Sequence, residues 1–233
     1  MHMKNKIYYI IICMSVVLCL VIGVLVKISF HNTVDPQNLE KEVSNHIVSN
    51  SDDFVGKLYF DNHIEKFSEL QKKSDLIVEI KLTGNRCLYS QATLSEAKVF
   101  KIYKGKVKPG DKILIYEPVF FLNNSYYTSS GYNLMKKNNS YIIFLKNLQI
   151  PKGYKYKNDE AKTYLPVSTV FAKYNIKLTD KEKIIDGTKL NTPLDSNSLK
   201  FKDVKDNEII STNIKTVNQY NYFKLSVLKT YKD

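Results

Sequence analysis

Residues 74–146 constrain the fold most, because they contain the clearest strand periodicity in the chain. Four apolar residues occupy alternate positions in the first part of this stretch: Leu76, Val78, Ile80 and Leu82. A period of two is typical of a strand with one buried side and one side facing solvent. Ile77 interrupts the alternation, so we expect the start of the outer side to be covered as well.

Three further runs in this stretch have strand character: residues 92–103, 113–116 and 141–145. The apolar positions of the first run change phase between Val99 and Phe100, which predicts a bulge. A polar break at residues 85–86 precedes this run, and a Pro-Gly turn at residues 109–110 follows it. Strands joined by short connections without helices predict an antiparallel sheet, and a sheet that curls on itself forms a small barrel.

Four segments in this order resemble known proteins: residues 74–78, 97–105, 109–113 and 136–145. They are similar to uncharacterised membrane-anchored surface proteins of bacteria and, more distantly, to the netrin-like module of tissue metalloproteinase inhibitors. The resemblance implies a five-stranded barrel of the OB type. In those inhibitors an N-terminal cysteine chelates the protease zinc and disulfides staple the barrel. Only Cys87 lies outside the apolar N-terminal run here, so the inhibitory chemistry is not implied.

The N-terminal residues 7–26 form an apolar run without charges, preceded by Lys4 and Lys6. A helix over this run spans about 30 Å, the hydrocarbon thickness of a bilayer. The positive flank favours a cytoplasmic N-terminus, with the bulk of the chain outside the cytoplasm. A cleaved signal peptide is the alternative, although no Ala-x-Ala-like site follows the run. We expect a single-pass signal anchor in the cell membrane.

Helical signals flank the predicted barrel on its N-terminal side. Asp35 and Pro36 favour a helix start, and three residues form an apolar stripe at a spacing of four: Leu39, Val43 and Ile47. We expect this short amphipathic helix to belong to a stalk, where it lies either on the lipid headgroups or on the domain. Asn62 and Glu65 have the spacing of a helix cap and its third residue, which predicts a helix over residues 62–73 that covers one open end of the barrel.

The C-terminal part is less regular. Residues 164–171 fit a fifth strand or an edge strand, and Pro166 favours the edge. Thr179 and Glu182 have capping-box spacing, which predicts a short helix that Gly187 ends. The last residues fit either a helix or a strand, and we favour the helix.

Together these patterns predict a mainly β fold with flanking helices (α+β), in which an N-terminal transmembrane helix precedes a small antiparallel OB-like β-barrel. The expected segments are a cytoplasmic tip with the signal anchor (residues 1–27), a stalk (28–60), a helix with the barrel (61–175) and a C-terminal extension of loop and helix (176–233).

The chain has a formal net charge of +12 and enough apolar and aromatic residues, including 17 Tyr and 11 Phe, to build a core. Lys4, Lys6 and Lys27 flank the apolar run, and the remainder is still basic. One explanation is a solvated surface in a lysine-rich chain. The other is attraction to an anionic partner such as lipid headgroups or cell-wall polymers.

Motifs for catalysis or cofactor binding are not evident in the sequence. It contains neither a Walker loop nor a GxGxxG motif, and its four histidines lack zinc-site spacing. Ser95 and Lys98 have the Ser-x-x-Lys spacing, but a strand places them on opposite sides. Cys87 is expected to be an incidental thiol in a loop. We therefore expect no cofactor, no metal and no enzyme activity.

Tyrosines in two predicted loops are the candidate contact residues: Tyr126, Tyr127 and Tyr132 between the third and fourth strands, and Tyr154 and Tyr156 after the fourth. They suit contact with a protein or an anionic envelope polymer, in an inhibitor-like manner or otherwise. Stacking on nucleic acid is the less favoured alternative, because export separates the domain from cytoplasmic nucleic acid. The main hypothesis is a non-catalytic binding module. A cell-envelope enzyme with a site that the sequence does not reveal is the alternative, and the partner and the oligomeric state stay open.

Overall fold

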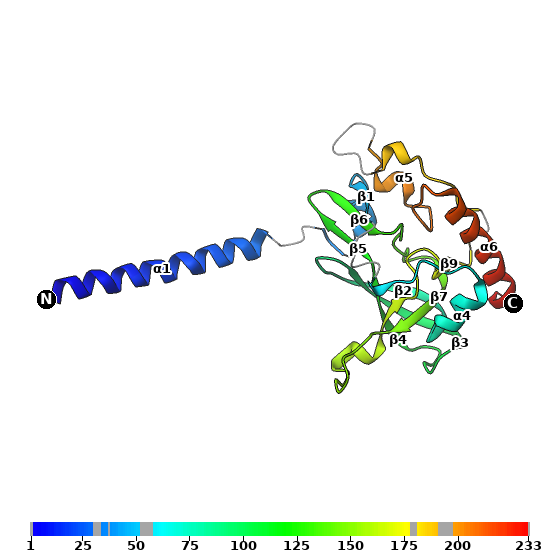
Figure 1. Ribbon diagram of the computed structural model, residues 1–233, viewed down its shortest axis with the longest axis horizontal. Helices are drawn as coiled ribbons and strands as arrows, with labels where there is room; N and C mark the ends of the chain where they lie inside the picture. Colours follow the sequence, from blue (N-terminus) through cyan, green and yellow to red (C-terminus); the bar gives the residue numbers. More distant parts are fainter. Residues whose placement is uncertain are drawn as a thin grey trace. The chain divides into compact units, whose positions relative to one another are not determined.

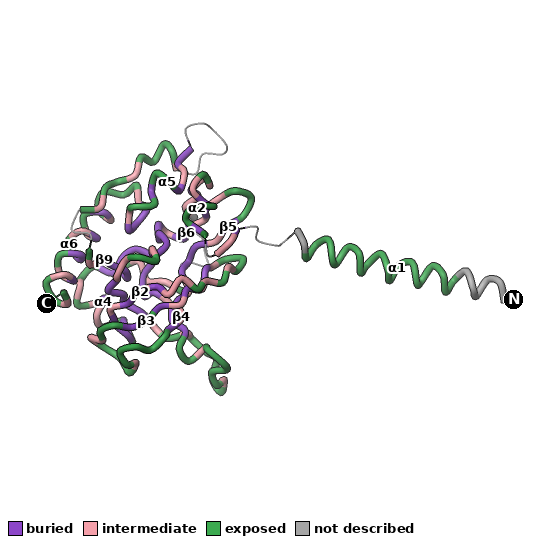
Figure 2. The backbone as a smooth tube through the Cα atoms, turned by 180° about the vertical axis from the view of Figure 1, so that it is seen from behind, coloured by how far each residue is buried: buried purple, intermediate pink, exposed green. Residues whose placement is uncertain are grey.

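The computed structural model describes most of the chain: residues 2–29, 34–36, 38–51, 58–177, 181–190 and 198–232. The chain divides into two units, Met1–Thr33 and Val34–Asp233. The first contains α1 (His2–Ser29), whose Tyr8–Lys27 part is long and apolar enough to cross a membrane. Figure 2 shows residues 8–27 of this helix exposed, whereas buried strands fill the interior of the second unit. The predicted N-terminal apolar helix is confirmed.

Five strands of the second unit form a closed barrel (Figure 1): β2 (Leu76–Leu88), β3 (Thr93–Lys104), β4 (Lys112–Glu117), β7 (Ser140–Asn147) and β8 (Thr163–Pro166). Their order is β2-β3-β4-β8-β7, and pairing of β2 with β7 closes the ring. The predicted OB-like barrel is confirmed. A short strand, β9 (Lys173–Asn175), also pairs with β7.

The four strands predicted within residues 74–146 pair antiparallel, as expected, but the fifth strand adds one parallel pair, β4 with β8. An antiparallel neighbour reverses the strand direction, and five reversals around a ring leave the direction inverted. A closed five-stranded barrel therefore needs a parallel pair. β8 is the predicted fifth strand rather than an edge. Pro166 is tolerated because β4 pairs only with Thr163 and Tyr164, so β8 is unpaired on that side at Pro166.

The pairing of β2 with β3 is irregular, as the change of phase in residues 92–103 predicts. The register shifts by one residue at Phe100 and again at Tyr103. The expected polar break at residues 85–86 does not end β2, which continues to Leu88. Cys87 is consequently an exposed thiol on a strand and not in a loop.

A second, smaller sheet contains β1 (Ile47–Ser51), β6 (Ser125–Ser129) and β5 (Val119–Leu122), in that order. β5 and β6 form a hairpin inside the segment that was expected to be a loop. Asn123 and Asn124 join them with φ values of 49° and 58°, as a two-residue hairpin turn requires. β1 pairs with β6 in parallel and brings the N-terminal residues into the folded unit.

The expected stalk is therefore wrong. Helix α2 (Leu39–Glu42) is a single turn, and the residues after it form a strand. Leu39, Val43 and Val48 are buried in a core that also receives residues from the β5–β6 hairpin and from the C-terminal part of the unit: Phe121, Tyr126, Phe201 and Ile210. Two residues of the predicted apolar stripe, Leu39 and Val43, thus belong to this core, whereas the third, Ile47, is only half-buried in β1.

Two helices cover the barrel on another side (Figure 1). Helix α4 (Phe67–Lys73) is shorter than predicted, because Asn62 is not its cap and instead accepts hydrogen bonds from Ser168 and Thr169. The predicted C-terminal helix is confirmed as α6 (Ile214–Tyr231), and Phe67 contacts Phe223 across the two helices. Shorter helices in the described part of the unit include η1 (Asn158–Lys162), η2 (Gly187–Lys189) and α5 (Phe201–Val204).

The C-terminal residues are part of the same compact unit and not an extension of it. Glu208 is buried and forms an ion pair with Lys224 of α6, with 2.6 Å between Oε1 and Nζ. Its other carboxylate oxygen accepts the backbone N–H of Asn175 in β9. The helix predicted over residues 179–185 is wrong for the described residues 181–185, which are not helical, and Thr179 lies outside the described residues.

Replacing Leu39 by Ala tests whether the N-terminal residues belong to the folded unit. Leu39 is 3% exposed, and the loss of a buried leucine side chain costs about 2–5 kcal/mol. We expect this decrease in the free energy of unfolding of the full chain, measured by urea denaturation in nanodiscs. Leu58, which is 60% exposed, is the matched control, and its replacement by Ala should cost under about 0.5 kcal/mol. Equal stability of the two variants would contradict the burial of Leu39 and support the interpretation of this segment as a stalk.

Candidate functional site

Two of the five candidate contact tyrosines, Tyr126 and Tyr132, are fully buried. The Tyr126 hydroxyl donates to Oδ1 of Asn133 over 2.7 Å, and the Tyr132 hydroxyl donates to Oε2 of Glu117 over 3.0 Å. Side chains alternate between the two sides of β6, and this alternation turns Tyr126 toward the core. The sequence analysis expected a loop here and therefore did not predict which side Tyr126 faces. Both tyrosines are core residues, and the prediction that they contact a partner is wrong.

The other three candidates remain at least partly accessible. Tyr127 stacks on Phe120 across the β5–β6 hairpin, with ring centroids 4.8 Å apart. In the loop between β7 and β8, Tyr154 donates to Glu160, and Tyr156 donates to the carbonyl oxygen of Leu148. Tyr127 belongs to the small sheet, whereas Tyr154 and Tyr156 belong to a loop of the barrel. Because two of the five candidates are also buried, the structure does not unite all five in one surface.

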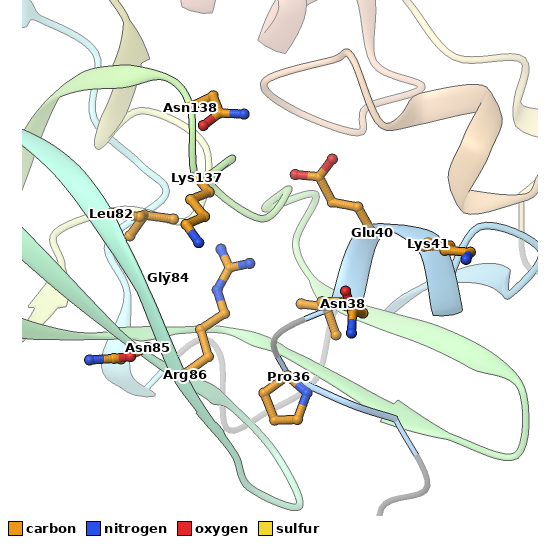
Figure 3. A pocket seen from close by; sticks show the side chains of 11 residues that line it. Pro36, Asn38, Glu40, Lys41, Leu82, Gly84, Asn85, Arg86, Lys137 and Asn138 are labelled. Carbon is orange, nitrogen blue, oxygen red and sulfur yellow. The ribbon is translucent and has the colours of Figure 1, made fainter.

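A pocket of about 260 Å³ opens beside the second half of β2, and we call it the cationic pocket (Figure 3). Its lining comes from α2 and its flanks, β2 and the segment before β7: Pro36, Asn38, Leu39, Glu40, Lys41, Leu82, Gly84, Asn85, Arg86, Lys137 and Asn138. Figure 3 shows the Arg86 guanidinium and the Lys137 amine turned toward each other, with Glu40 on the other side of the opening. Two positive groups thus meet in one concave site.

Arg86 is the only arginine among the 35 basic residues of the chain. Its side chain is 7% exposed, and the guanidinium is held at several points. Nε donates to Oγ of Ser95 over 3.0 Å, and Nη2 donates to Oε1 of Glu117 over 3.3 Å and to the carbonyl oxygen of Met135. Only a planar fork of donors can make these bonds together, whereas a lysine presents a point charge.

Glu117, at the end of β4, fixes the orientation of this arginine. The side chain is fully buried, and both of its oxygens accept hydrogen bonds. Besides Arg86 and Ser95, the donors are the Tyr132 hydroxyl and the backbone N–H of Met135, the latter over 2.8 Å. A buried carboxylate is tolerated when hydrogen-bond donors surround both of its oxygens. Removing one of these partners leaves an unpaired buried group, which lowers the free energy of unfolding.

Lys137 reaches the pocket because a glycine lies beneath its side chain. Gly84 has a φ of +99°, and a Cβ at this position would lie 2.7 Å from Cε of Lys137. A larger residue would displace the lysine and strain the backbone. In the part of the chain that the structure describes, no carboxylate forms an ion pair with Lys137. Its amine and the neighbouring amides are suited to an anionic group such as phosphate or carboxylate.

A second concavity of about 260 Å³ is apolar and lies near the loops with which OB folds bind ligands. Its lining comprises Tyr59, Phe60, Gln91, Ala92, Tyr116, Pro118, Leu148 and Leu165. Tyr89, 48% exposed, has its ring 6.1 Å from that of Tyr116. The described lining of this pocket has few polar groups and no charged side chain. The pocket therefore offers apolar contact area, without a charge that would orient a ligand.

Lys173 is the strongest candidate for a catalytic group. Burial lowers its pKa to about 8, and its amine donates to the carbonyl oxygens of Asn133 and Glu208 over 2.6 and 3.1 Å. The cavity beside it has a volume of only about 10 Å³, which is at most enough for one water molecule. A substrate cannot reach this amine, so its role is to join β9 to the neighbouring loops.

The remaining expectations about chemistry concern Ser95 and the cysteines. Ser95 is buried against Glu117 while Lys98 is exposed, so the predicted placement of this pair on opposite sides of the strand is confirmed. All three cysteines are free. Among the described residues, no group of three or more His, Cys, Asp or Glu is placed to hold a metal ion.

No protein-family model matches the chain, and a comparison with curated proteins finds no relative. The resemblance to netrin-like modules therefore stays a prediction beyond the shared OB-like barrel. The functional argument depends on the residues of the cationic pocket. The sequence analysis missed them, although a single arginine in a chain whose other basic residues are all lysines was a usable signal.

Replacing Arg86 by Lys tests whether the guanidinium fork is required. The variant keeps the charge but leaves acceptors on Ser95, Glu117 and Met135 without their donors. We expect the free energy of unfolding to fall by about 2–3 kcal/mol in urea denaturation of the full chain. The control is Lys106, an exposed residue, whose replacement by Arg should change stability by under about 0.5 kcal/mol. An Arg86→Lys variant as stable as the parent would contradict this role of Arg86.

Proposed function

We propose that the chain is a single-pass, membrane-anchored binding module without catalytic activity, and that its cationic pocket holds an anionic group of a cell-envelope ligand. The observation that carries this proposal is the meeting of Arg86 and Lys137 in one pocket. In this proposal the bulk of the chain lies outside the cytoplasm.

The charges of the pocket support an anionic ligand. Arg86, Lys137 and Lys41 contribute positive charge, and Glu40 is the acidic residue of the lining. Glu117 neutralises part of the arginine charge from behind, while Lys137 adds a second cation. Because the guanidinium is already held in place, binding an anion costs little side-chain entropy. Oxygen-rich anions such as phosphate and carboxylate match these donors.

The residue types of the lining support binding rather than catalysis. The described lining residues include no serine, histidine or cysteine that could act as a nucleophile or base beside the two cations. The barrel interior is filled by apolar side chains. Its buried residues are Leu76, Val78, Ile80, Leu82, Ala97, Val99, Ile113, Ile115, Met135, Tyr141, Ile143, Leu145 and Tyr164.

The placement outside the cytoplasm rests on the N-terminal segment. The span Tyr8–Lys27 follows two lysines, and positive residues before the first span favour a cytoplasmic N-terminus. A module anchored on the outer side meets phosphodiesters from two sources, lipid headgroups and wall polymers. Both present the same anionic oxygens, so the pocket chemistry is compatible with either.

Inorganic phosphate is the probe for the cationic pocket. At about ten times its dissociation constant, bound phosphate adds about 1.4 kcal/mol and raises the midpoint of thermal unfolding by about 3–6 °C. We expect this rise for the full chain in phosphatidylcholine nanodiscs at constant ionic strength, and not for the Lys137→Ala variant. A Lys106→Ala control should respond like the parent. Equal rises in all three proteins would indicate a general salt effect and overturn the proposal.

Nanodiscs of phosphatidylglycerol separate the two sources. If a lipid headgroup occupies the pocket, the midpoint is already raised in these nanodiscs and added phosphate has little further effect. If the source is a wall polymer, phosphatidylglycerol and phosphatidylcholine nanodiscs give the same midpoint, and a soluble glycerol-phosphate polymer raises it in both.

Protease treatment of intact cells tests the placement outside the cytoplasm. We expect residues after Lys27 to be cut from outside, while mass analysis finds a membrane-bound fragment that begins at Met1. A fragment that lacks the first residues would indicate a cleaved signal peptide. Full protection of the domain until the cells are lysed would contradict the proposed topology.

A further inference from the structure

A larger pocket, of about 430 Å³, lies where the start of α6 meets the segments around residues 60–63 and 168–171. We call it the amide pocket, since amides and hydroxyls dominate its lining: Asn50, Phe60, Asn62, His63, Ser130, Val170, Phe171, Ile210, Ser211, Thr212, Asn213, Thr216 and Gln219. Lys, Arg, Asp and Glu make up 25% of the chain, yet none of them is among these described residues. The pocket is therefore built for neutral groups.

Two asparagines in the pocket are oriented by hydrogen bonds to their side-chain oxygens. Oδ1 of Asn62 accepts from the Ser168 hydroxyl and from the Thr169 backbone, over 2.8 and 3.0 Å. Oδ1 of Asn213 caps α6 by accepting the N–H of Lys215 over 2.9 Å. The amide nitrogens of both asparagines have no hydrogen-bond partner among the described residues, so each keeps two donors for a ligand.

Gln219 provides the complementary group. Its Nε2 donates to the carbonyl oxygen of Ile64, which fixes the side chain, and its Oε1 has no hydrogen-bond partner in the described part of the chain. The pocket thus combines fixed donors with a fixed acceptor. A group that both donates and accepts, such as a hydroxyl, uses this combination better than an anion, which only accepts.

Apolar side chains form the rest of the wall. Phe171, Val170 and Ile210 are buried, and Phe60, which is half-buried, also lines the pocket. A sugar ring has hydroxyls around its edge and C–H groups on its faces, so it needs polar groups and an apolar surface together. An apolar ligand would leave the amides unpaired, and an anion would find no lysine or arginine in the described lining.

We propose that the amide pocket binds a neutral sugar ring, as a site separate from the cationic pocket. The proposal does not depend on the proposed function, because the two lining sets share no residue. The amide nitrogens of Asn62 and Asn213 donate to ring hydroxyls, Oε1 of Gln219 accepts from one, and a ring face packs on the phenyl group of Phe60.

The test uses glucose and N-acetylglucosamine as probes for the full chain in phosphatidylcholine nanodiscs. Saturation-transfer NMR detects sugar protons in contact with the protein, and a titration provides the dissociation constant. We expect contact for the ring protons of at least one probe. No transfer to either sugar at millimolar concentration would overturn the proposal.

Asn213→Asp is the decisive variant. Aspartate caps a helix as well as asparagine does, so α6 is retained while two donors become an acceptor. We expect binding to weaken about tenfold or more. Asn213→Ser keeps the cap without adding charge and should also weaken binding. Asn218→Asp makes the same change on an exposed position of α6 and should leave binding unchanged. Equal affinity of the parent and both Asn213 variants would overturn the assignment.

Discussion

The buried carboxylate of Glu117 is the interaction on which both the fold and the cationic pocket depend. It ends β4, receives Arg86 from β2 and the Ser95 hydroxyl from β3, and accepts the backbone N–H of Met135 from the segment before β7. Through Tyr132 it also reaches the segment that follows β6. One charge therefore joins three barrel strands to the segment between β6 and β7, and the same bonds hold the guanidinium at the pocket.

The barrel is completed by segments distant in sequence. The barrel strands enclose one core. The N-terminal residues around Leu39 pack with the β5–β6 hairpin in a second core. Helices α4 and α6 cover a third core beside β7 and β9. The cationic pocket lies where the N-terminal segment meets β2, and the amide pocket lies where α6 begins. Both candidate sites thus form where added segments meet, and the barrel interior serves as the scaffold.

Local patterns in the sequence predict the barrel strands and α6, because alternation and helical spacing act over a few residues. They fail where partners are distant. The stripe at Leu39 and Val43 reads as a surface helix until β1 is seen to pair with β6. From the sequence, Tyr132 is expected to be an accessible loop residue, but its hydroxyl is buried and donates to Glu117. Arg86 looks like part of a polar break, since its partners come from β3, β4 and the segment before β7. Buried polar contacts between distant segments leave no periodic signal.

The most direct measurement of the central claim is the ¹⁵N–¹H spectrum of the arginine side chain during a phosphate titration of the full chain in nanodiscs. Arg86 is the only arginine, so its guanidinium resonance needs no assignment. If the cationic pocket binds anions, this resonance shifts with a saturable dependence on phosphate and stays still under added chloride. A resonance that does not respond to phosphate while the protein remains folded would contradict the account.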